Sequence, residues 1–204
     1  MRPRSIRGNA LLASVKPGGG GWRAAEDLYR LAAGAIISEA MLERIVLVER
    51  ARLRPGSVPG EGALERLRRE VEAEPRRQKI KNWLEETAPW AQSAIGEELA
   101  AAGLARLVSK RFLGVFLPQP QLEILDRPAQ DEAHRIVRET MIANHPMHET
   151  ALLALLAGSI RNPVEMKRGQ ARRRFRELQA FLPEQVRAVV EAYRKWEIRG
   201  PADG

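Results

Sequence analysis

The chain has 204 residues, of which 44% are hydrophobic and 29% are charged. This balance excludes an intrinsically disordered chain and supplies enough apolar residues for the core of one domain. Because there is no cysteine, disulfides, thiolate metal sites and thiol nucleophiles are excluded. No apolar run approaches the roughly 18–20 residues of a membrane-spanning helix. We therefore expect a soluble cytoplasmic protein without a targeting segment.

The net charge of +8 is concentrated at the two ends of the chain. Residues 1–60 hold 10 basic and 5 acidic residues, and residues 161–204 hold 11 and 6. A basic surface attracts nucleic acid or anionic lipid, and charge alone does not choose between them. We expect residues 1–10 to form a flexible basic arm, residues 11–198 a single domain and residues 199–204 a disordered tail.

The first quarter of the sequence has mostly helical periodicity. Residues 11–15 fit either a short strand or the start of a helix. Apolar residues spaced three and four apart then predict helices over 22–33 and 34–44. Residues 45–53 are β-branched and then alternate with charged residues, which predicts a strand. The turn-rich segment RPGSVPGEG follows at 54–62.

Three helices are predicted in the middle of the chain. They cover residues 63–72, 77–87 and 90–102, and Pro89 is expected to separate the second from the third. Gly103 fits the position that caps the end of the third helix.

A β-hairpin is predicted next. Residues 104–117 read as a strand with Lys110 and Arg111 at its tip. Residues 118–126 supply the partner strand through Leu122 and Ile124.

The last third of the sequence predicts four helices, over 131–142, 149–160, 164–182 and 183–196. The second of these is apolar nearly all round, which indicates full burial. The predicted fold class is therefore mainly α: a compact single-domain helical bundle with a small β-hairpin.

The sequence contains no recognisable catalytic constellation. His145, His148 and Glu149 could hold a metal ion, but one proline-containing loop seldom presents three ligands to one ion, so we interpret them as structural. Paired carboxylates such as Glu85 and Glu86 are adjacent in sequence and diverge on a helix. We predict no enzymatic activity, no cofactor and no metal site.

Two groups of residues are candidate contacts for anions. The predicted helix 164–182 carries a basic patch of Lys167, Arg168, Arg172, Arg173 and Arg176. Its arginines could contact phosphates, although Glu165 and Glu177 interrupt it and a solvated outer face is the alternative. The second group is Trp22 with Arg23: a ring for the head-group region of a membrane beside a cation for phosphate. The alternative is that Trp22 packs the first helix against the core.

Five stretches resemble the Golgi phosphoprotein 3 family in their order and spacing. They are LLASVKPGGGGW (11–22), GAIISEAMLERIVLVE (34–49), IKNWLEETAP (80–89), IGEELAAAGLARLVSKRFLGVF (95–116) and ETALLALLAGS (149–159). The resemblance implies a mostly helical domain with a hairpin, acting as an adaptor. In eukaryotic members it implies binding of phosphatidylinositol 4-phosphate and of cytoplasmic tails of Golgi glycosyltransferases.

The residues of the family's lipid site are carried over by spacing. The tryptophan position falls on Ala24, two residues from Trp22, and one arginine position falls on Ala33. The two remaining basic positions fall near Pro89 and Gln92. These basic residues are therefore absent, and Arg30, one turn before Ala33, is the candidate to replace them.

Our leading hypothesis is a cytoplasmic adaptor that touches membranes transiently through Trp22, Arg23 and Arg30. Its expected partners are anionic lipid head groups, phosphoinositides among them, and an unidentified protein client, and a homo-oligomer remains open. The rival hypothesis is a winged-helix DNA-binding protein, with 77–87, 90–102 and the hairpin as helix, helix and wing. The second helix of that arrangement has two glutamates and no lysine or arginine, which argues against nucleic acid as a partner.

Overall fold

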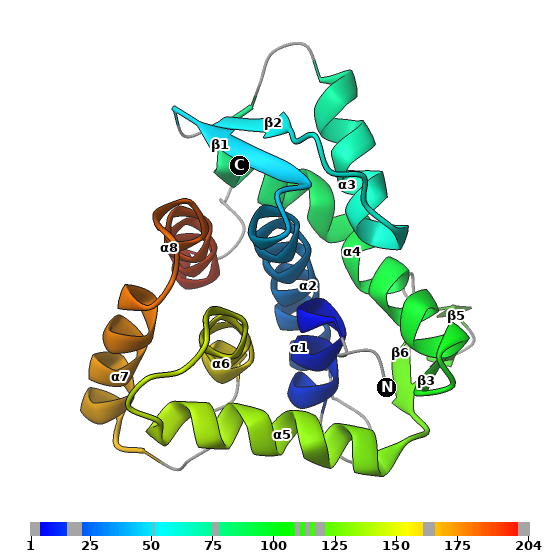
Figure 1. Ribbon diagram of the computed structural model, residues 1–204. Helices are drawn as coiled ribbons and strands as arrows, with labels where there is room; N and C mark the ends of the chain where they lie inside the picture. The colour runs from blue at the N-terminus through cyan, green and yellow to red at the C-terminus, as the bar shows by residue number, and fades with distance from the viewer. Residues whose placement is uncertain are drawn as a thin grey trace.

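The computed structural model describes residues 5–15, 22–50, 52–74, 78–108, 111–112, 115–116, 121–160 and 166–199. The fold is mainly α, as predicted (Figure 1). The helices are α1 (Ile6–Ser14), α2 (Trp22–Leu42), α3 (Gly62–Ala73), α4 (Ile80–Ala101), α5 (Arg127–Ile142), α6 (His148–Ile160), α7 (Arg168–Ala180) and α8 (Glu184–Arg199). The strands are β1 (Val46–Glu49), β2 (Arg52–Pro55), β3 (Ala105–Val108), β4 (Arg111–Phe112), β5 (Val115–Phe116) and β6 (Gln121–Ile124). None of the helices in the described residues is long and apolar enough to cross a bilayer.

Helix α2 lies at the centre of the bundle, in contact with α1, α3, α4, α6 and α8 (Figure 1). The two helices predicted over 22–33 and 34–44 are one helix, so the predicted break at Gly34 is wrong. A Cβ atom on Gly34 would lie 3.0 Å from Cδ2 of Tyr193 in α8. The glycine therefore serves close packing between α2 and α8, and that packing outweighs its poor helix propensity.

Helix α4 continues through Pro89, which corrects the predicted break there. Proline removes one backbone hydrogen bond and costs about 3 kcal/mol inside a helix. Pro89 itself is exposed, while the opposite face of the helix is buried both before and after it, through Trp83, Leu84, Ala91 and Ile95. Burying these side chains offsets the lost bond. Because residues 80–101 form one helix, the helix–helix–wing order is absent and the winged-helix hypothesis is wrong.

The end of α4 confirms the predicted glycine cap. Gly103 has φ of 72° and donates its N–H to the carbonyl of Ala100, while the N–H of Leu104 donates to Leu99 at 2.9 Å. This pair of bonds is the Schellman motif, which favours glycine because the backbone is left-handed there. The cap directs the chain from α4 into β3.

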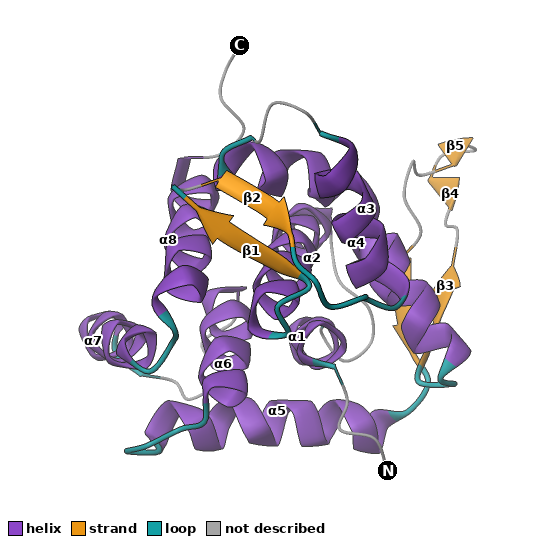
Figure 2. Cartoon of the chain, turned by 45° about the horizontal axis from the view of Figure 1, so that its top comes forward, coloured by secondary structure: helices purple, strands orange, loops and turns teal. Residues whose placement is uncertain are grey.

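Two antiparallel hairpins complete the fold (Figure 2). The single strand predicted over 45–53 is wrong, because the chain reverses after Arg50, which has φ of 51°, and β1 pairs with β2. The predicted partner strand of the second hairpin is confirmed, since Leu122 lies opposite Leu107 in the β3–β6 pair. Its tip is not at Arg111 as predicted, because Arg111 pairs with Phe116 in the β4–β5 extension. Lys110 lies outside the described residues.

The first helix begins earlier than predicted. Residues 6–10, which were expected in the flexible basic arm, are helical in α1, and Arg7 is buried. The segment 11–15, which fitted either a strand or a helix start, is mostly helical. Residues 1–4 and 200–204 lie outside the described part of the chain, and Arg199 belongs to α8.

The remaining helices differ from prediction only at their ends. Helix α5 begins at Arg127, four residues earlier than expected, because the Asp126 carboxylate accepts the N–H of Ala129 and caps it. Helix α7 spans Arg168–Ala180, shorter than the predicted 164–182. The expected burial of α6 is confirmed, with residues 151–157 all buried.

Candidate functional site

The predicted basic patch lies on α7, at one corner of the molecule (Figure 1). The apolar side of this helix turns inward: Leu178 is fully buried, and the ring of half-buried Phe175 lies against Gly158 of α6. Helical geometry therefore turns the other side to solvent. The exposed basic residues are Lys167, Arg172, Arg173 and Arg176. The side chain of Arg168 is not among those described.

Ion pairing divides the basic residues of this patch into two kinds. Arg173 Nε lies 3.0 Å from Glu177 Oε1, so its charge is largely met within the helix. Arg172 and Arg176 form no ion pair with a carboxylate anywhere in the described residues. These two cations, one helical turn apart, share a face and are available to an external anion.

Arg174 belongs to the same run but has a structural role. Its guanidinium donates to the carbonyl of Thr140 at 3.0 Å and to that of Ala143, at the C-terminal end of α5. The carbonyls at a helix end have no partner within the helix, so a cation satisfies both their hydrogen bonding and the negative end of the dipole. Arg174 thus fixes α7 against α5.

The second candidate group lies at the start of α2. Trp22 and Arg23 form its first turn, and their side chains are outside those described. Arg30 lies about 12 Å further along the helix axis and is buried, with only 8% of its surface exposed. Arg30 is therefore not an open surface contact in this structure.

A buried ionic junction, which the sequence analysis did not identify, joins α1, α2, α3 and α4. The Arg7 guanidinium pairs with Glu39 of α2 at 3.1 Å and with Glu98 of α4 at 2.8 Å. Glu39 also accepts the backbone N–H groups of Ile6 and Arg7, and Glu98 accepts that of Ala63. Each carboxylate thus caps the start of another helix. The available signal was Glu39 itself, a lone charge in the apolar stretch AIISEAML.

Burial and pairing act against each other in this junction. Burial raises the pKa of the Glu39 carboxyl above its ordinary value, and Arg7 opposes that rise. Burial lowers the pKa of Arg7, but the two carboxylates outweigh it and raise that pKa overall. Arg7 stays charged, so it is an integral part of the core.

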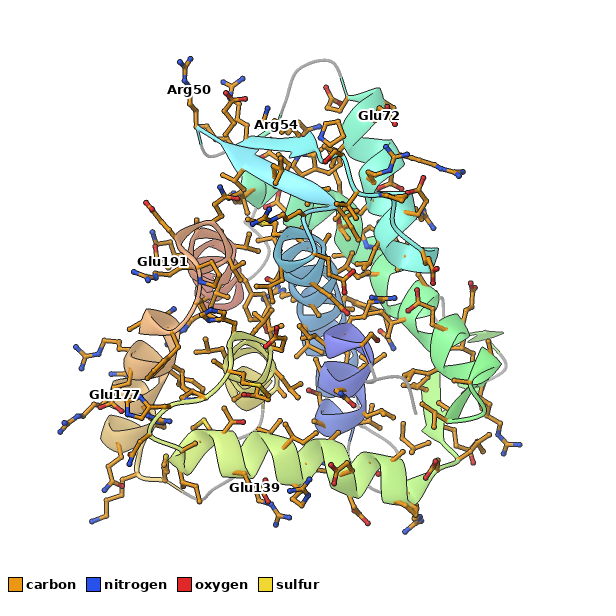
Figure 3. The ribbon with its side chains drawn as sticks, in the orientation of Figure 1. Arg50, Arg54, Glu72, Glu139, Glu177 and Glu191 are labelled. Atoms are coloured by element: carbon orange, nitrogen blue, oxygen red, sulfur yellow. The ribbon has the colours of Figure 1, made fainter. Side chains whose placement is uncertain are left out.

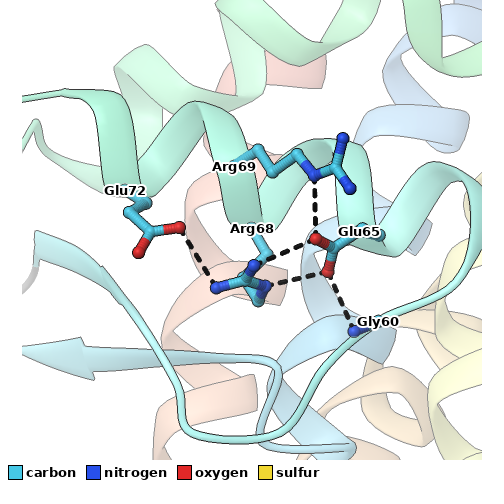
Figure 4. Close-up of polar contacts among 5 residues, drawn as sticks. All are labelled: Gly60, Glu65, Arg68, Arg69 and Glu72. Carbon is cyan, nitrogen blue, oxygen red and sulfur yellow. Dashed lines mark hydrogen bonds and ion pairs between the residues drawn. The ribbon is translucent and has the colours of Figure 1, made fainter.

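A network of hydrogen bonds and ion pairs lies at the surface of α3, in contrast to the buried junction at Arg7 (Figure 4). The Glu65 carboxylate accepts hydrogen bonds from Arg68 and Arg69 and from the backbone N–H of Gly60. These bonds lower the pKa of Glu65 to about 2. Nearby, the Arg66 guanidinium stacks 4.2 Å from the ring centroid of half-buried Trp90.

His145 of the α5–α6 loop and His148 at the start of α6 both contact Phe181, the residue that follows α7. The ring of His145 meets that of Phe181 edge-on at 6.1 Å between centroids, and His148 Nδ1 contacts the Phe181 carbonyl. Among the described residues, no group of three histidines and carboxylates is arranged to hold a metal ion. The loop thus packs against the end of α7.

A family model for Golgi phosphoprotein 3 (GPP34) matches residues 9–193. The chain belongs to the Golgi phosphoprotein 3 family. The match runs from α1 into α8 and confirms the resemblance found in the sequence. No curated protein matches the chain. Membership of this family, whose members are generally non-enzymatic adaptors, supports an adaptor-like role.

The positions carried over from the lipid site of the Golgi phosphoprotein 3 family are neutral in this chain. Ala33 on α2 is fully buried and Gln92 on α4 is nearly so, while Pro89 is exposed. The side chain of Ala24 is not among those described. Positive charge for an anionic ligand is therefore not present at these α4 positions.

Proposed function

We propose that the chain is a cytoplasmic, non-enzymatic adaptor that associates peripherally with anionic membranes, including those with phosphatidylinositol 4-phosphate, and binds a protein client. The observation that carries this proposal is the outer face of α7, where Arg172 and Arg176 are exposed and have no carboxylate partner in the described residues. Cations of this kind are attracted to the negative surface of the cytoplasmic leaflet. Family membership supports the adaptor part of the proposal.

The start of α2 supplies the second part of the proposed lipid contact. Trp22 would place its ring at the head-group level and Arg23 would meet phosphate. Arg30 lies two helical turns further along α2 and is buried, so we do not include it in the direct contact. Each basic residue near an anionic surface contributes about 1 kcal/mol, so a single chain binds weakly. A client or further copies of the chain would raise the avidity.

Flotation with liposomes tests this proposal. The purified protein is mixed at low salt with vesicles of neutral lipid, of anionic lipid, and of anionic lipid with phosphatidylinositol 4-phosphate. We expect flotation with both anionic preparations, none with neutral lipid, and loss of binding in high salt because the charges are screened. Flotation with none of the vesicles would contradict the proposal.

The Trp22→Ala variant locates the contact on α2. We expect it to float less than the wild type, while Val58→Ala, which removes an exposed apolar side chain elsewhere, floats as the wild type does. If the wild type and Trp22→Ala float equally, α2 is not part of the lipid contact, and the proposal then rests on α7 alone.

A further inference from the structure

The loop between α5 and α6 exposes two large apolar side chains. Ile142, the last residue of α5, is 67% exposed, and Met147, just before α6, is 68% exposed. They are the two most exposed large hydrophobic residues in the described part of the chain. Isolated exposed hydrophobic residues need no explanation. Ile142 and Met147, however, lie only five positions apart at the two ends of one short loop, so their exposure requires an explanation.

This loop is held at both ends. Arg174 of α7 donates to the carbonyls of Thr140 and Ala143, on either side of Ile142. At the other end, His148 contacts the carbonyl of Phe181 through Nδ1. Figure 1 shows the loop running beside α7 from the end of α5 to the start of α6. The structure therefore holds Ile142 and Met147 outward on a fixed support.

One exposed arginine lies beside the pair. Arg138 lies one helical turn before Ile142 on the same face of α5, is exposed and forms no ion pair with any described carboxylate. The neighbouring carboxylate of Glu139, which Figure 3 labels on α5, is already paired with Arg135. One exposed carboxylate, Glu149, adjoins the loop. The region we call the α7 corner (Arg138, Ile142 and Met147) therefore combines two exposed apolar side chains with one cation.

We propose that the α7 corner is a membrane-insertion surface, with Ile142 and Met147 entering the boundary between head groups and acyl chains while Arg138 meets a lipid phosphate. Buried apolar area and attraction to anionic lipid are the two terms that bind interfacial elements. A fluid bilayer accepts two projecting side chains without a shaped hollow, whereas a protein partner must supply one. The inference rests on the proposed function and names the surface that performs it.

The experiment compares two matched double variants in the flotation assay with vesicles of mixed neutral and anionic lipid. Ile142→Ser/Met147→Ser removes the projecting pair, and Val58→Ser/Leu125→Ser removes two exposed large hydrophobic residues elsewhere in the described part of the chain, which are 39% and 51% exposed. We expect the first variant to bind about tenfold more weakly, because partial burial of two large side chains is lost. The second should bind as the wild type does. Thermal unfolding checks that each variant is folded.

The outcomes separate this inference from the proposed function. Failure of the wild type to float contradicts both. Flotation of the wild type and of the Ile142→Ser/Met147→Ser variant to the same extent contradicts the insertion surface alone and leaves these residues to a protein partner. If that variant is unfolded, Arg138→Glu replaces it, with Arg50→Glu at the turn of the β1–β2 hairpin as its charge-matched control. Equal binding by these two would overturn the inference.

Discussion

Arg7 and Arg172 carry the same guanidinium in opposite surroundings. Arg7 lies at the buried junction of α1, α2, α3 and α4, where Glu39 and Glu98 bind it and also cap other helices. Arg172 stands on the outer face of α7 with no carboxylate partner in the described residues. The first is saturated with internal contacts and can only stabilise the fold. The second is available to a partner, so the surroundings and not the residue type separate structure from function.

Removing the buried arginine, Arg7, is expected to have the largest effect on stability. Arg7→Ala leaves Glu39 buried without its counter-charge, which costs about 3–5 kcal/mol in the free energy of unfolding. Chemical denaturation followed by circular dichroism measures the loss. A loss below about 1 kcal/mol, the level of a surface ion pair, would show that the junction is not a structural element.

A change at Arg174 tests whether an arginine of the basic run on α7 can stabilise the fold as Arg7 does. Arg174→Ala removes charge-assisted bonds to the carbonyls of Thr140 and Ala143, so we expect about 1.5–3 kcal/mol of destabilisation. Its neighbour Arg173, which pairs with Glu177 at the surface, is the control and should lose at most about 1 kcal/mol on the same change. Equal losses for the two variants would contradict the distinction.

The Glu65 network predicts a pH dependence with a definite sign. Because folding lowers the pKa of Glu65 from 4.5 to about 2, its contribution to stability is full above pH 4.5 and is lost as the pH falls toward 2. The Glu65→Gln variant should therefore have a flatter stability profile than the wild type over that acid range. Urea denaturation at several pH values measures both profiles, and parallel profiles would contradict the prediction.

The smallest effect on stability is expected on the outer face of α7. Arg172→Ala/Arg176→Ala should change the free energy of unfolding by no more than about 0.5 kcal/mol, since neither side chain has a partner among the residues that the structure describes. Flotation with anionic liposomes should nevertheless fall, and its salt dependence should become shallower. A strong loss of stability with unchanged flotation would reverse the roles assigned to Arg7 and Arg172.

Much of the fold could be predicted because its local patterns agree with its tertiary structure. The continuous apolar run of α6, the Gly103 cap and the strand partners Leu122 and Ile124 all follow from spacing and turn chemistry. The errors at Gly34 and Pro89 arose where packing outweighs propensity. In α4 the apolar spacing continues across Pro89, from Leu84 to Ala91, and that continuity was the better guide.

The candidate sites were less predictable because exposure depends on which elements meet. The sequence identified the basic run of α7, but it could not separate Arg174, which binds α5, from Arg172, which binds nothing in the described residues. Arg7 read as part of a basic arm, since its two partners lie 32 and 91 residues away in the chain. The outward position of Met147 follows only from the contacts between its loop and α7.

The most direct test of the membrane contact at the α7 corner uses the absence of cysteine in the chain. The variants Met147→Cys and Leu125→Cys are each labelled with an environment-sensitive fluorophore, and anionic liposomes are added. We predict a blue shift and an intensity gain at position 147, because the dye enters the bilayer interface, and no change at position 125. A response at position 125 alone, or at neither position while the labelled protein still floats, would contradict the account.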